Sequence, residues 1–181
     1  MESELKGTEL ILGGARSGKS SLAEQLATDS GLPVIYVATA TAGDDEMAAR
    51  IVQHQSQRPA SWQLVEEPLD LAAVIKRYSR PENCLLIDCL TLWLTNCLCA
   101  EGATDEDWQQ YKRDFLNALL HAEGRIILVS NEVGQGIVPM GELSRRFVDE
   151  SGWLHQAIAR QAERVVFVIA GLPQVLKGPA W

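Results

Sequence analysis

A glycine-rich segment near the amino terminus constrains this chain more than any other feature. Residues 13–20 read Gly-Gly-Ala-Arg-Ser-Gly-Lys-Ser, which fits the pattern G-x-x-x-x-G-K-[S/T]. The apolar run 10–12 before it predicts a buried strand, and residues 20–26 after it predict a helix. A loop between a strand and a helix directs backbone N–H groups and the positive end of the helix dipole toward an anion. The segment therefore predicts a phosphate-binding loop rather than a chance glycine-rich turn.

Two side chains of this loop are expected to have separate roles. Lys19 would place a positive charge on the β- and γ-phosphates of a nucleotide, and the hydroxyl of Ser20 can bind Mg²⁺. We expect the whole loop to contact the nucleotide, that is Gly13, Gly14, Ala15, Arg16, Ser17, Gly18, Lys19 and Ser20.

Apolar runs alternate with helical patterns along the rest of the chain. We expect strands at 34–38, 84–87, 125–129 and 165–170, a short extended segment at 62–65, and helices at 44–57, 69–78, 90–100, 106–122 and 140–162. Continuous apolar strands separated by helices predict a parallel sheet that helices cover on both faces. The predicted fold class is α/β, a mostly parallel P-loop NTPase-like (RecA-like) sheet, in a single domain over residues 1–181. The strand at 165–170 is expected to be the last, and the tail 176–181 receives no role.

Charge and composition exclude several classes of function. With 24 acidic and 16 basic residues the net charge is −8, which argues against a nucleic-acid-binding surface. No apolar run reaches 18 residues, so no membrane span is expected, and the first residues lack a signal-peptide pattern, which predicts a cytoplasmic protein. The cysteines at 84, 89, 97 and 99 match no common zinc spacing and are expected to be reduced thiols.

Polar residues follow the predicted strands at four places. They are the phosphate loop, Thr39–Thr41, Asp88 and Ser130–Glu132. Because ligands of such sheets bind at the carboxyl ends of the strands, we expect these clusters to converge on one site. Asp88 follows four apolar residues, and we expect it to bind Mg²⁺ rather than only to begin a turn.

A basic pattern with one histidine lies in the predicted helix 44–57 and just after it. Arg50, His54 and Arg58 are four residues apart, so they would share one helix face. The neighbouring positive charges disfavour the protonated imidazole, and a neutral imidazole is a competent nucleophile toward phosphorus. A solvated basic face with an incidental histidine is the alternative that the spacing leaves open.

The chain resembles the bifunctional adenosylcobinamide kinase / adenosylcobinamide-phosphate guanylyltransferase family of cobalamin synthesis. The matching segments are the phosphate loop, residues 44–51 with His54 and Arg58-Pro59, the run 88–96, and the run 130–139 that begins Ser-Asn-Glu-Val-Gly. They follow in order over nearly the whole chain. One departure lies at 152–156, where the family pattern Gly-Arg-x-Asn-Gln is replaced by Gly-Trp-Leu-His-Gln. The histidine of this segment, His155, and His121 are expected to be packed or surface residues.

The resemblance implies two reactions. In the first, the γ-phosphoryl group of ATP or GTP passes to the aminopropanol hydroxyl of adenosylcobinamide. In the second, GMP from GTP passes through a covalent GMP–histidine intermediate at His54 to adenosylcobinamide phosphate, giving adenosylcobinamide-GDP. The implied catalytic residues are His54 and Lys19, and the implied metal is Mg²⁺ at Ser20 and Asp88. Besides the loop, the implied GTP contacts are Ala38, Thr39, Ala40, Gln55, Ser56, Gln57, Arg58, Glu66 and Asp88.

Two other functions stay open at this point. One is a plain P-loop small-molecule kinase without nucleotidyl transfer, and the other is a GTP-binding module that does not consume its ligand. The sequence has no Asp/Asn-Lys-x-Asp run that would read guanine in such a module. No catalytic base for the kinase step can be picked. A substrate as large as a cobinamide favours a homo-oligomer with a shared site, bordered by Trp62, Trp93 or Trp153, although tryptophans pack more often in cores.

Overall fold

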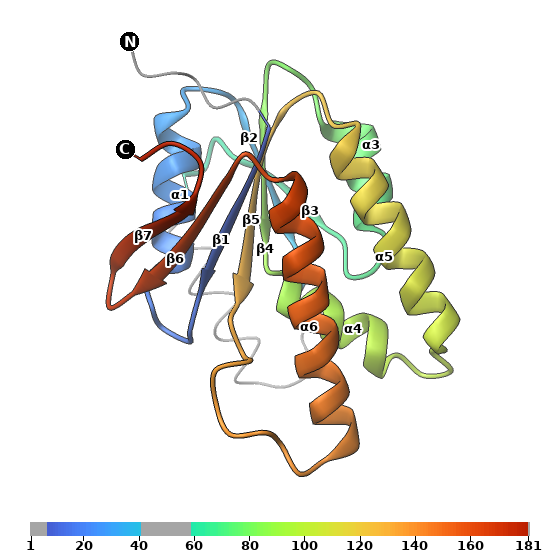
Figure 1. The fold of residues 1–181 in the computed structure, drawn as a ribbon. Coiled ribbons are helices and arrows are strands. Elements are labelled where there is room, and N and C mark those ends of the chain that lie inside the picture. Colours follow the sequence, from blue (N-terminus) through green and yellow to red (C-terminus); the bar gives the residue numbers. More distant parts are fainter. Residues whose placement is uncertain (1–6, 41–58, 181) are drawn as a thin grey trace.

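The computed structural model describes residues 7–40 and 59–180 (Figure 1). The strands are β1 (Thr8–Gly13), β2 (Val34–Ala38), β3 (Gln63–Glu66), β4 (Cys84–Asp88), β5 (Arg125–Asn131), β6 (Arg164–Ile169) and β7 (Leu172–Lys177). The helices are α1 (Lys19–Asp29), α3 (Leu71–Tyr78), α4 (Leu90–Cys99), α5 (Asp105–Leu120) and α6 (Glu142–Gln161). The predicted helix 44–57 lies outside the described residues.

The described strands form one sheet in the order β3-β2-β4-β5-β1-β6-β7. All pairs from β3 to β6 are parallel, and β7 pairs antiparallel with β6. The mostly parallel α/β sheet predicted from the sequence is therefore confirmed.

Helices cover the two faces of the sheet, and each face has its own apolar core. Helix α1 lies on one face and packs on the cluster that contains Ile11, while α3, α4, α5 and α6 lie on the other face around Leu10 and Leu12 (Figure 1). Successive residues of a strand point to opposite faces, so a continuous apolar strand serves both cores.

An aromatic cluster fills the thicker core. The ring of Trp93 lies 5.4 Å from that of Trp108 and 4.8 Å from that of Phe115, measured between centroids. The indole N–H of Trp93 donates a hydrogen bond to the backbone oxygen of Leu69 at 2.7 Å. Trp93 is fully buried, so it stabilises the core and does not face a ligand.

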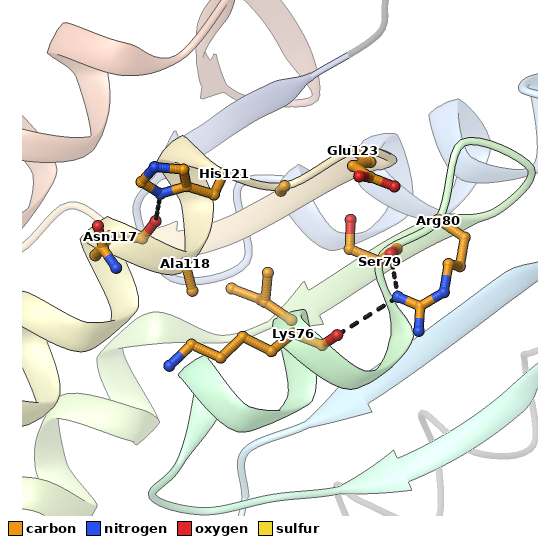
Figure 2. A pocket seen from close by; sticks show the side chains of 9 residues that line it. Lys76, Ser79, Arg80, Asn117, Ala118, His121 and Glu123 are labelled. Atoms are coloured by element: carbon orange, nitrogen blue, oxygen red, sulfur yellow. Dashed lines mark hydrogen bonds between the residues drawn. The ribbon is translucent and has the colours of Figure 1, made fainter.

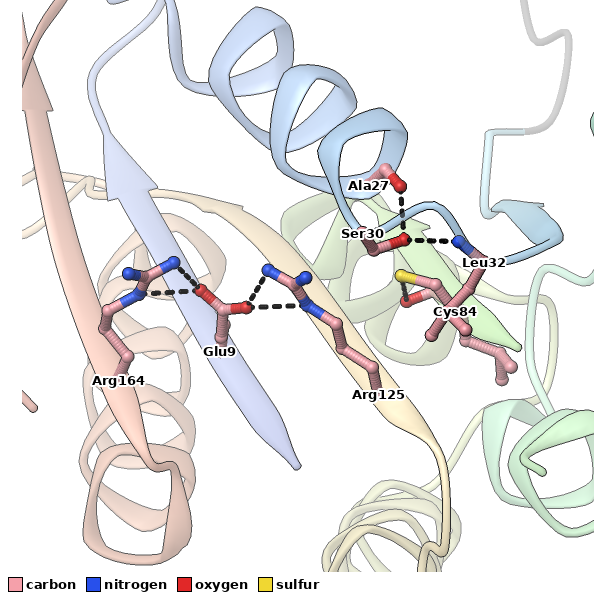
Figure 3. A network of polar contacts seen from close by, with 8 residues as sticks. Glu9, Ala27, Ser30, Leu32, Cys84, Arg125 and Arg164 are labelled. Carbon is pink, nitrogen blue, oxygen red and sulfur yellow. Dashed lines mark hydrogen bonds and ion pairs between the residues drawn. The ribbon is translucent and has the colours of Figure 1, made fainter. Parts of the chain in front are cut away.

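The amino ends of the central strands hold a buried ion-pair network. Glu9 of β1 lies between Arg125 of β5 and Arg164 of β6 (Figure 3). One carboxylate oxygen accepts from Nε and Nη2 of Arg125 at 2.9 and 2.6 Å. The other accepts from Nε of Arg164 at 2.7 Å and from its Nη2. Each guanidinium group places two N–H donors on one carboxylate oxygen, so the buried charge of Glu9 is compensated.

The expectation that 165–170 is the last strand was wrong. Strand β7 returns antiparallel along β6 after a tight turn in which Ala170 and Gly171 have φ of 53° and 77°. The strand is largely exposed and contains Pro173, which edge strands tolerate. A short exposed strand with proline has the same local pattern as a solvated tail, which is why the sequence did not reveal it.

None of the helices in the described parts of the chain is long and apolar enough to cross a membrane.

Candidate functional site

The site is built at the carboxyl edge of the sheet. Strands β2, β4, β5 and β1 are consecutive neighbours, so the residues that end them lie side by side. The register pairs Ala38 with Asp88 and Gly13 with Asn131. The polar clusters of the sequence therefore meet along one edge, because parallel strands all end on the same side.

The phosphate loop depends on two glycines for its shape. A Cβ atom on Gly13 would lie 2.4 Å from Oγ of Ser17 and 2.7 Å from the backbone oxygen of Val168. Gly18 has a φ of 95° and forms the N-cap of α1. A residue with a Cβ would clash at the first position and be strained at the second.

The turn between β6 and β7 supports the same loop from behind. The backbone N–H of Gly171 donates to the backbone oxygen of Ser17 at 2.8 Å. A Cβ on Gly18 would lie 3.2 Å from Cα of Gly171, so the two backbones approach closely. The hairpin that the sequence missed thus fixes the outer wall of the phosphate loop.

The ammonium of Lys19 and the hydroxyl of Ser17 are buried and have few polar partners among the described residues. Lys19 is only 8% exposed, and its ammonium donates to the backbone oxygen of Gly14 at 3.1 Å. Within residues 7–40 and 59–180 it forms no salt bridge, and the buried hydroxyl of Ser17 has no hydrogen-bond partner. Ser20 is half-buried in the first turn of α1, which contains no acidic residue. A buried cation beside a helix N-terminus is suited to an anion.

Thr39 holds two strand ends together. Its hydroxyl donates to the backbone oxygen of Cys89 at 2.7 Å and accepts from the backbone N–H of Cys89 at 2.9 Å. Its own carbonyl accepts from Nδ2 of Asn96 at 2.8 Å, and Asn96 also donates to the carbonyl of Pro68 at 3.1 Å. The side chain of Thr39 is fully occupied, so it fixes the backbone around Ala38 rather than offering a free hydroxyl.

Asp88 and Glu66 are the last residues of β4 and β3, which lie on either side of β2. Asp88 is half-buried at the end of β4, and its backbone oxygen accepts from the N–H of Thr39 at 3.4 Å. Glu66 is exposed at the end of β3, where it pairs in register with Ala38. The loop and Asp88 occupy the centre of the edge, and Glu66 lies on its outermost strand.

Thr91 and Asn131 join the start of α4 to the end of β5. The hydroxyl of Thr91 accepts from the backbone N–H of Asn131 at 3.1 Å and from its Nδ2 at 2.9 Å. Cys89 Sγ lies 3.3 Å from the same hydroxyl. Both segments carried the family resemblance, but no local pattern of the sequence shows that these side chains meet.

A buried histidine lies behind Glu132. His155 of α6 is 6% exposed, and its Nε2 lies 2.7 Å from Oγ of Ser130. Its Nδ1 lies 3.9 Å from a carboxylate oxygen of Glu132. Burial lowers the pKa of His155, and the carboxylate of Glu132 opposes that shift. Both histidines were expected to be packed or on the surface: His155 is packed, with partners at the carboxyl edge, and His121 is exposed.

The remaining predicted residues are placed as follows. Arg50, His54, Gln55, Ser56, Gln57 and Arg58 lie outside the described residues. Trp153 is more than half exposed on α6, and Trp62 is half-buried, with its ring stacked 6.4 Å from that of Tyr36.

A cavity of about 410 Å³ lies at the opposite edge of the sheet, between the ends of α3 and α5 (Figure 2). Lys76, Arg80 and His121 border it. Arg80 donates to the backbone oxygens of Ser79 at 2.6 Å and Lys76 at 3.4 Å, and His121 Nδ1 lies 2.8 Å from that of Asn117. Arg80 and His121 thus bind backbone oxygens at the ends of α3 and α5.

Comparison with known proteins agrees with this geometry. The sequence model of the family described as cobinamide kinase / cobinamide phosphate guanyltransferase matches residues 9–176. The bifunctional adenosylcobalamin biosynthesis protein CobP of Pseudomonas aeruginosa is 59% identical over 170 residues, covering 94% of this chain and 97% of that protein. The corresponding CobU protein of Escherichia coli is 38% identical over 180 residues and covers 93% of this chain and 98% of its own length.

Solved structures of distant sequence share the fold. The flagellar accessory protein FlaH from Methanocaldococcus jannaschii has a TM-score of 0.53 at 14% identity, over 95% of this chain and 78% of that one. A solved ATPase domain has a TM-score of 0.50 at 16% identity, over 89% of this chain and 68% of that one. At such identities the likeness concerns the sheet and its helices alone.

The full-length relatives and the family match favour neither a plain kinase nor a GTP-binding module. The chain belongs to the cobinamide kinase / cobinamide phosphate guanyltransferase family and is a bifunctional enzyme of adenosylcobalamin biosynthesis.

Proposed function

We propose that both reactions use one nucleotide site at the carboxyl edge of the sheet, with the triphosphate in the phosphate loop. The observation that carries this proposal is Lys19, an almost buried ammonium at the N-terminus of α1 without a salt bridge in the described residues. The loop N–H groups and this ammonium would stabilise the charge that develops on the transferred phosphoryl group. ATP or GTP serves the kinase step, and GTP serves the second step.

The other GTP contacts are proposed along the neighbouring strand ends. Ala38, Glu66 and Asp88 are the last residues of β2, β3 and β4, which are adjacent in the sheet, and Ala40 follows β2. Thr39 is proposed to act by holding the backbone of its two neighbours, because its hydroxyl is bound to Cys89. Gln55, Ser56, Gln57 and Arg58 complete the proposed set from outside the described residues.

The residues at the centre of the edge fit a magnesium ion. In the described chain no three histidine, cysteine, aspartate or glutamate side chains gather into a metal cluster. Mg²⁺ commonly takes one or two protein oxygens and completes its shell with water and substrate phosphates. Ser20 and Asp88 offer a hydroxyl and a carboxylate of this kind, and Mg²⁺, when bound, would neutralise phosphate charge.

The second reaction is proposed to proceed through His54. The imidazole would attack the α-phosphorus of GTP, forming a P–N bond as the bond to pyrophosphate breaks. The phosphate oxygen of adenosylcobinamide phosphate would then attack the same phosphorus, break the P–N bond and give adenosylcobinamide-GDP. Two features support this proposal: the resemblance of residues 44–59 to the family, and the four-residue spacing that places Arg50 and Arg58 on either side of His54 in the sequence.

The decisive experiment follows GMP onto the protein. After incubation with GTP, mass spectrometry should find GMP on the peptide that contains His54, as an acid-labile adduct. His54→Ala should abolish the adduct and guanylyl transfer while the kinase step continues, and His121→Ala, which changes an exposed histidine at the other edge, should retain both. An enzyme without the adduct would be a plain kinase, and loss of both activities in a folded His54→Ala protein would contradict separate roles.

A homo-oligomer is proposed as the working form. Ile137 and Met140 are 97% and 95% exposed in the loop before α6, and Trp153 is exposed on that helix. Exposed large apolar side chains on this loop and helix are typical of an interaction surface, and a shared site would suit a large substrate. Analytical ultracentrifugation should show more than one copy, and Ile137→Ser with Met140→Ser should shift the mass toward that of one chain.

A further inference from the structure

One carboxylate at the carboxyl edge is distinguished by its place in the strand order. Glu66 lies on the outermost strand, and Glu67 accepts the backbone N–H groups that begin the α3 segment, at 2.8 and 2.9 Å. Asp88 is assigned above to Mg²⁺. Glu132 follows β5, the direct neighbour of β1, and its backbone N–H donates to the oxygen of Gly13 at 3.0 Å. Glu132 is therefore held through its backbone against Gly13, the first residue of the phosphate loop.

The two oxygens of the Glu132 carboxylate have different neighbours. Oε1 accepts from the backbone N–H of Gly134 at 2.6 Å. In the described residues Glu132 forms no salt bridge with lysine or arginine, and its side chain is 23% exposed. A carboxylate that a backbone N–H anchors at one oxygen, and that no lysine or arginine of the described residues binds, is suited to accept a proton.

His155 lies against the second oxygen. Its Nδ1 is 3.9 Å from Oε2 of Glu132, and its Nε2 is 2.7 Å from the hydroxyl of Ser130, which is buried. Burial favours the neutral ring, which carries one N–H. The negative carboxylate favours that proton on Nδ1, with Ser130 donating to Nε2. The neutral ring then packs beside the carboxylate of Glu132 and adds no positive charge there.

We infer that Glu132 is the catalytic base of the kinase step and that His155 is its positioning residue; the inference rests on the function proposed above. The hydroxyl oxygen of cobinamide forms a bond to the γ-phosphorus of ATP or GTP as its O–H bond breaks, and the proton passes to Oε2 of Glu132. The bond from the γ-phosphorus to the bridging oxygen breaks, and its electron pair leaves with the nucleoside diphosphate. The second reaction transfers GMP to a phosphate that has no hydroxyl proton to lose, so it does not need this base.

The two reactions give the test. The kinase step is measured with cobinamide and ATP, and guanylyl transfer is measured separately with supplied cobinamide phosphate and GTP. Glu132→Gln keeps the shape of the side chain but cannot accept the proton. It should lower the kcat of the kinase step by about 100-fold or more, as loss of a general base does, with KM values nearly unchanged. Guanylyl transfer and the GMP adduct should stay at the wild-type level.

A matched control separates the base from its charge. Glu142→Gln removes an exposed carboxylate at the start of α6, so it makes the same chemical change ten residues further along the chain. This variant should keep the wild-type rate of both reactions. A loss equal to that of Glu132→Gln would mean that the change of charge, and not a base at residue 132, is measured.

Two variants test the positioning role of His155. His155→Phe fills a similar volume without a polar atom, and should lower the kinase kcat about 10-fold, within the range ascribed to misplaced catalytic groups, without raising KM for ATP. His155→Asn restores the residue of the family pattern and retains an N–H donor, so it should recover part of the rate. Thermal unfolding of each variant shows that it is folded.

Three results would overturn the inference. They are a Glu132→Gln enzyme within threefold of wild-type kinase activity (about 0.7 kcal/mol), an equal loss in both reactions by the folded variant, and a His155→Phe effect on KM alone. A wild-type protein that does not phosphorylate cobinamide would instead overturn the proposed function, and the inference with it. The wild-type kinase rate, measured first, distinguishes these cases.

Discussion

The two edges of the sheet use charged residues in opposite ways. At the amino edge, each oxygen of Glu9 binds one guanidinium group, from Arg125 or Arg164, and the carboxylate is fully buried (Figure 3). At the carboxyl edge, Lys19 is also almost buried, but among the described residues its ammonium donates to a neutral carbonyl and forms no salt bridge. Glu132 lies 3.9 Å from a histidine and stays partly exposed.

The difference separates buried charges that the fold itself compensates from a buried charge that a ligand could compensate. Burial of a charge is costly unless a partner compensates it. Glu9 has that compensation within the sheet, so its network is complete without any ligand. Lys19 lacks an anionic partner in the described residues, and a nucleotide triphosphate would supply one. Variants at each edge test whether this difference holds.

The largest effect is expected at the amino edge, on the free energy of unfolding. Glu9→Gln leaves two buried guanidinium groups without their carboxylate, and should lower the free energy of unfolding by about 3–5 kcal/mol. Urea unfolding measures this as a lower midpoint, and KM for the nucleotide should stay unchanged. Glu123→Gln, an exposed change near the same edge, should stay within about 0.5 kcal/mol of wild type. A Glu9→Gln protein of unchanged stability would show that the network is not needed to hold the strands.

The next largest effect is expected at the carboxyl edge, on enzyme activity instead of stability. Lys19→Ala should lower both reactions by about 100- to 1,000-fold, because both use the same phosphate loop. Its unfolding midpoint should stay near that of wild type, since in the described residues the ammonium loses one hydrogen bond to a carbonyl and no salt bridge. Lys76→Ala, an exposed change at the far edge, is the control for loss of a positive charge. Full activity of Lys19→Ala in either reaction would remove the loop from that step.

A smaller effect concerns pH and His155. Burial lowers the pKa of this imidazole in the folded protein below its ordinary value of 6.5. The unfolded chain then binds the proton more readily, so stability should fall as the pH is lowered through 6.5 toward the folded pKa. Urea unfolding from about pH 8 to about pH 5 should show this loss, and His155→Asn should reduce it. An identical pH dependence in both proteins would mean that His155 is not the group responsible.

The smallest effect is expected in the order in which the cysteine thiols are alkylated. Burial raises the pKa of Cys84 to about 12 beside the Glu9 network, and of Cys97 to about 12 in the core. Burial and the nearby Asp88 raise the pKa of Cys89. Native alkylation at about pH 8 should therefore label exposed Cys99 first, as read by mass spectrometry, and all the cysteines after denaturation. Labelling of Cys89 well before Cys84 would show that the carboxyl edge opens more readily than the amino edge.

Much of the fold could be predicted from local patterns. The apolar runs of β1, β2, β4 and β5 and the periodicity of α5 are each contained within one short segment, and together they predict the sheet and its class. The phosphate loop is also local, since glycines, lysine and serine act within eight residues. The single domain over 1–181, the oligomer and the role of His54 stay predictions.

Other parts of the site could not be read from one segment. Thr39 was expected among the nucleotide contacts, but its hydroxyl binds the backbone of Cys89, 50 residues away. His155 had only the pattern of a packed residue, and its contact with Ser130 joins residues 25 apart. Strand β7 looked like a tail, although its turn supports the phosphate loop through Gly171.

The mostly parallel sheet and the meeting of its polar strand ends at one edge could be predicted from the amino-acid pattern alone. Both follow from periodicity and from the shared direction of parallel strands, which do not depend on the order of the strands. The choice of partners across the sheet depends on the three-dimensional fold, because the strand order places β5 and β6 on either side of β1. That order brings Arg164 to Glu9 across 155 residues, and it places Glu132 beside the phosphate loop with His155 behind it.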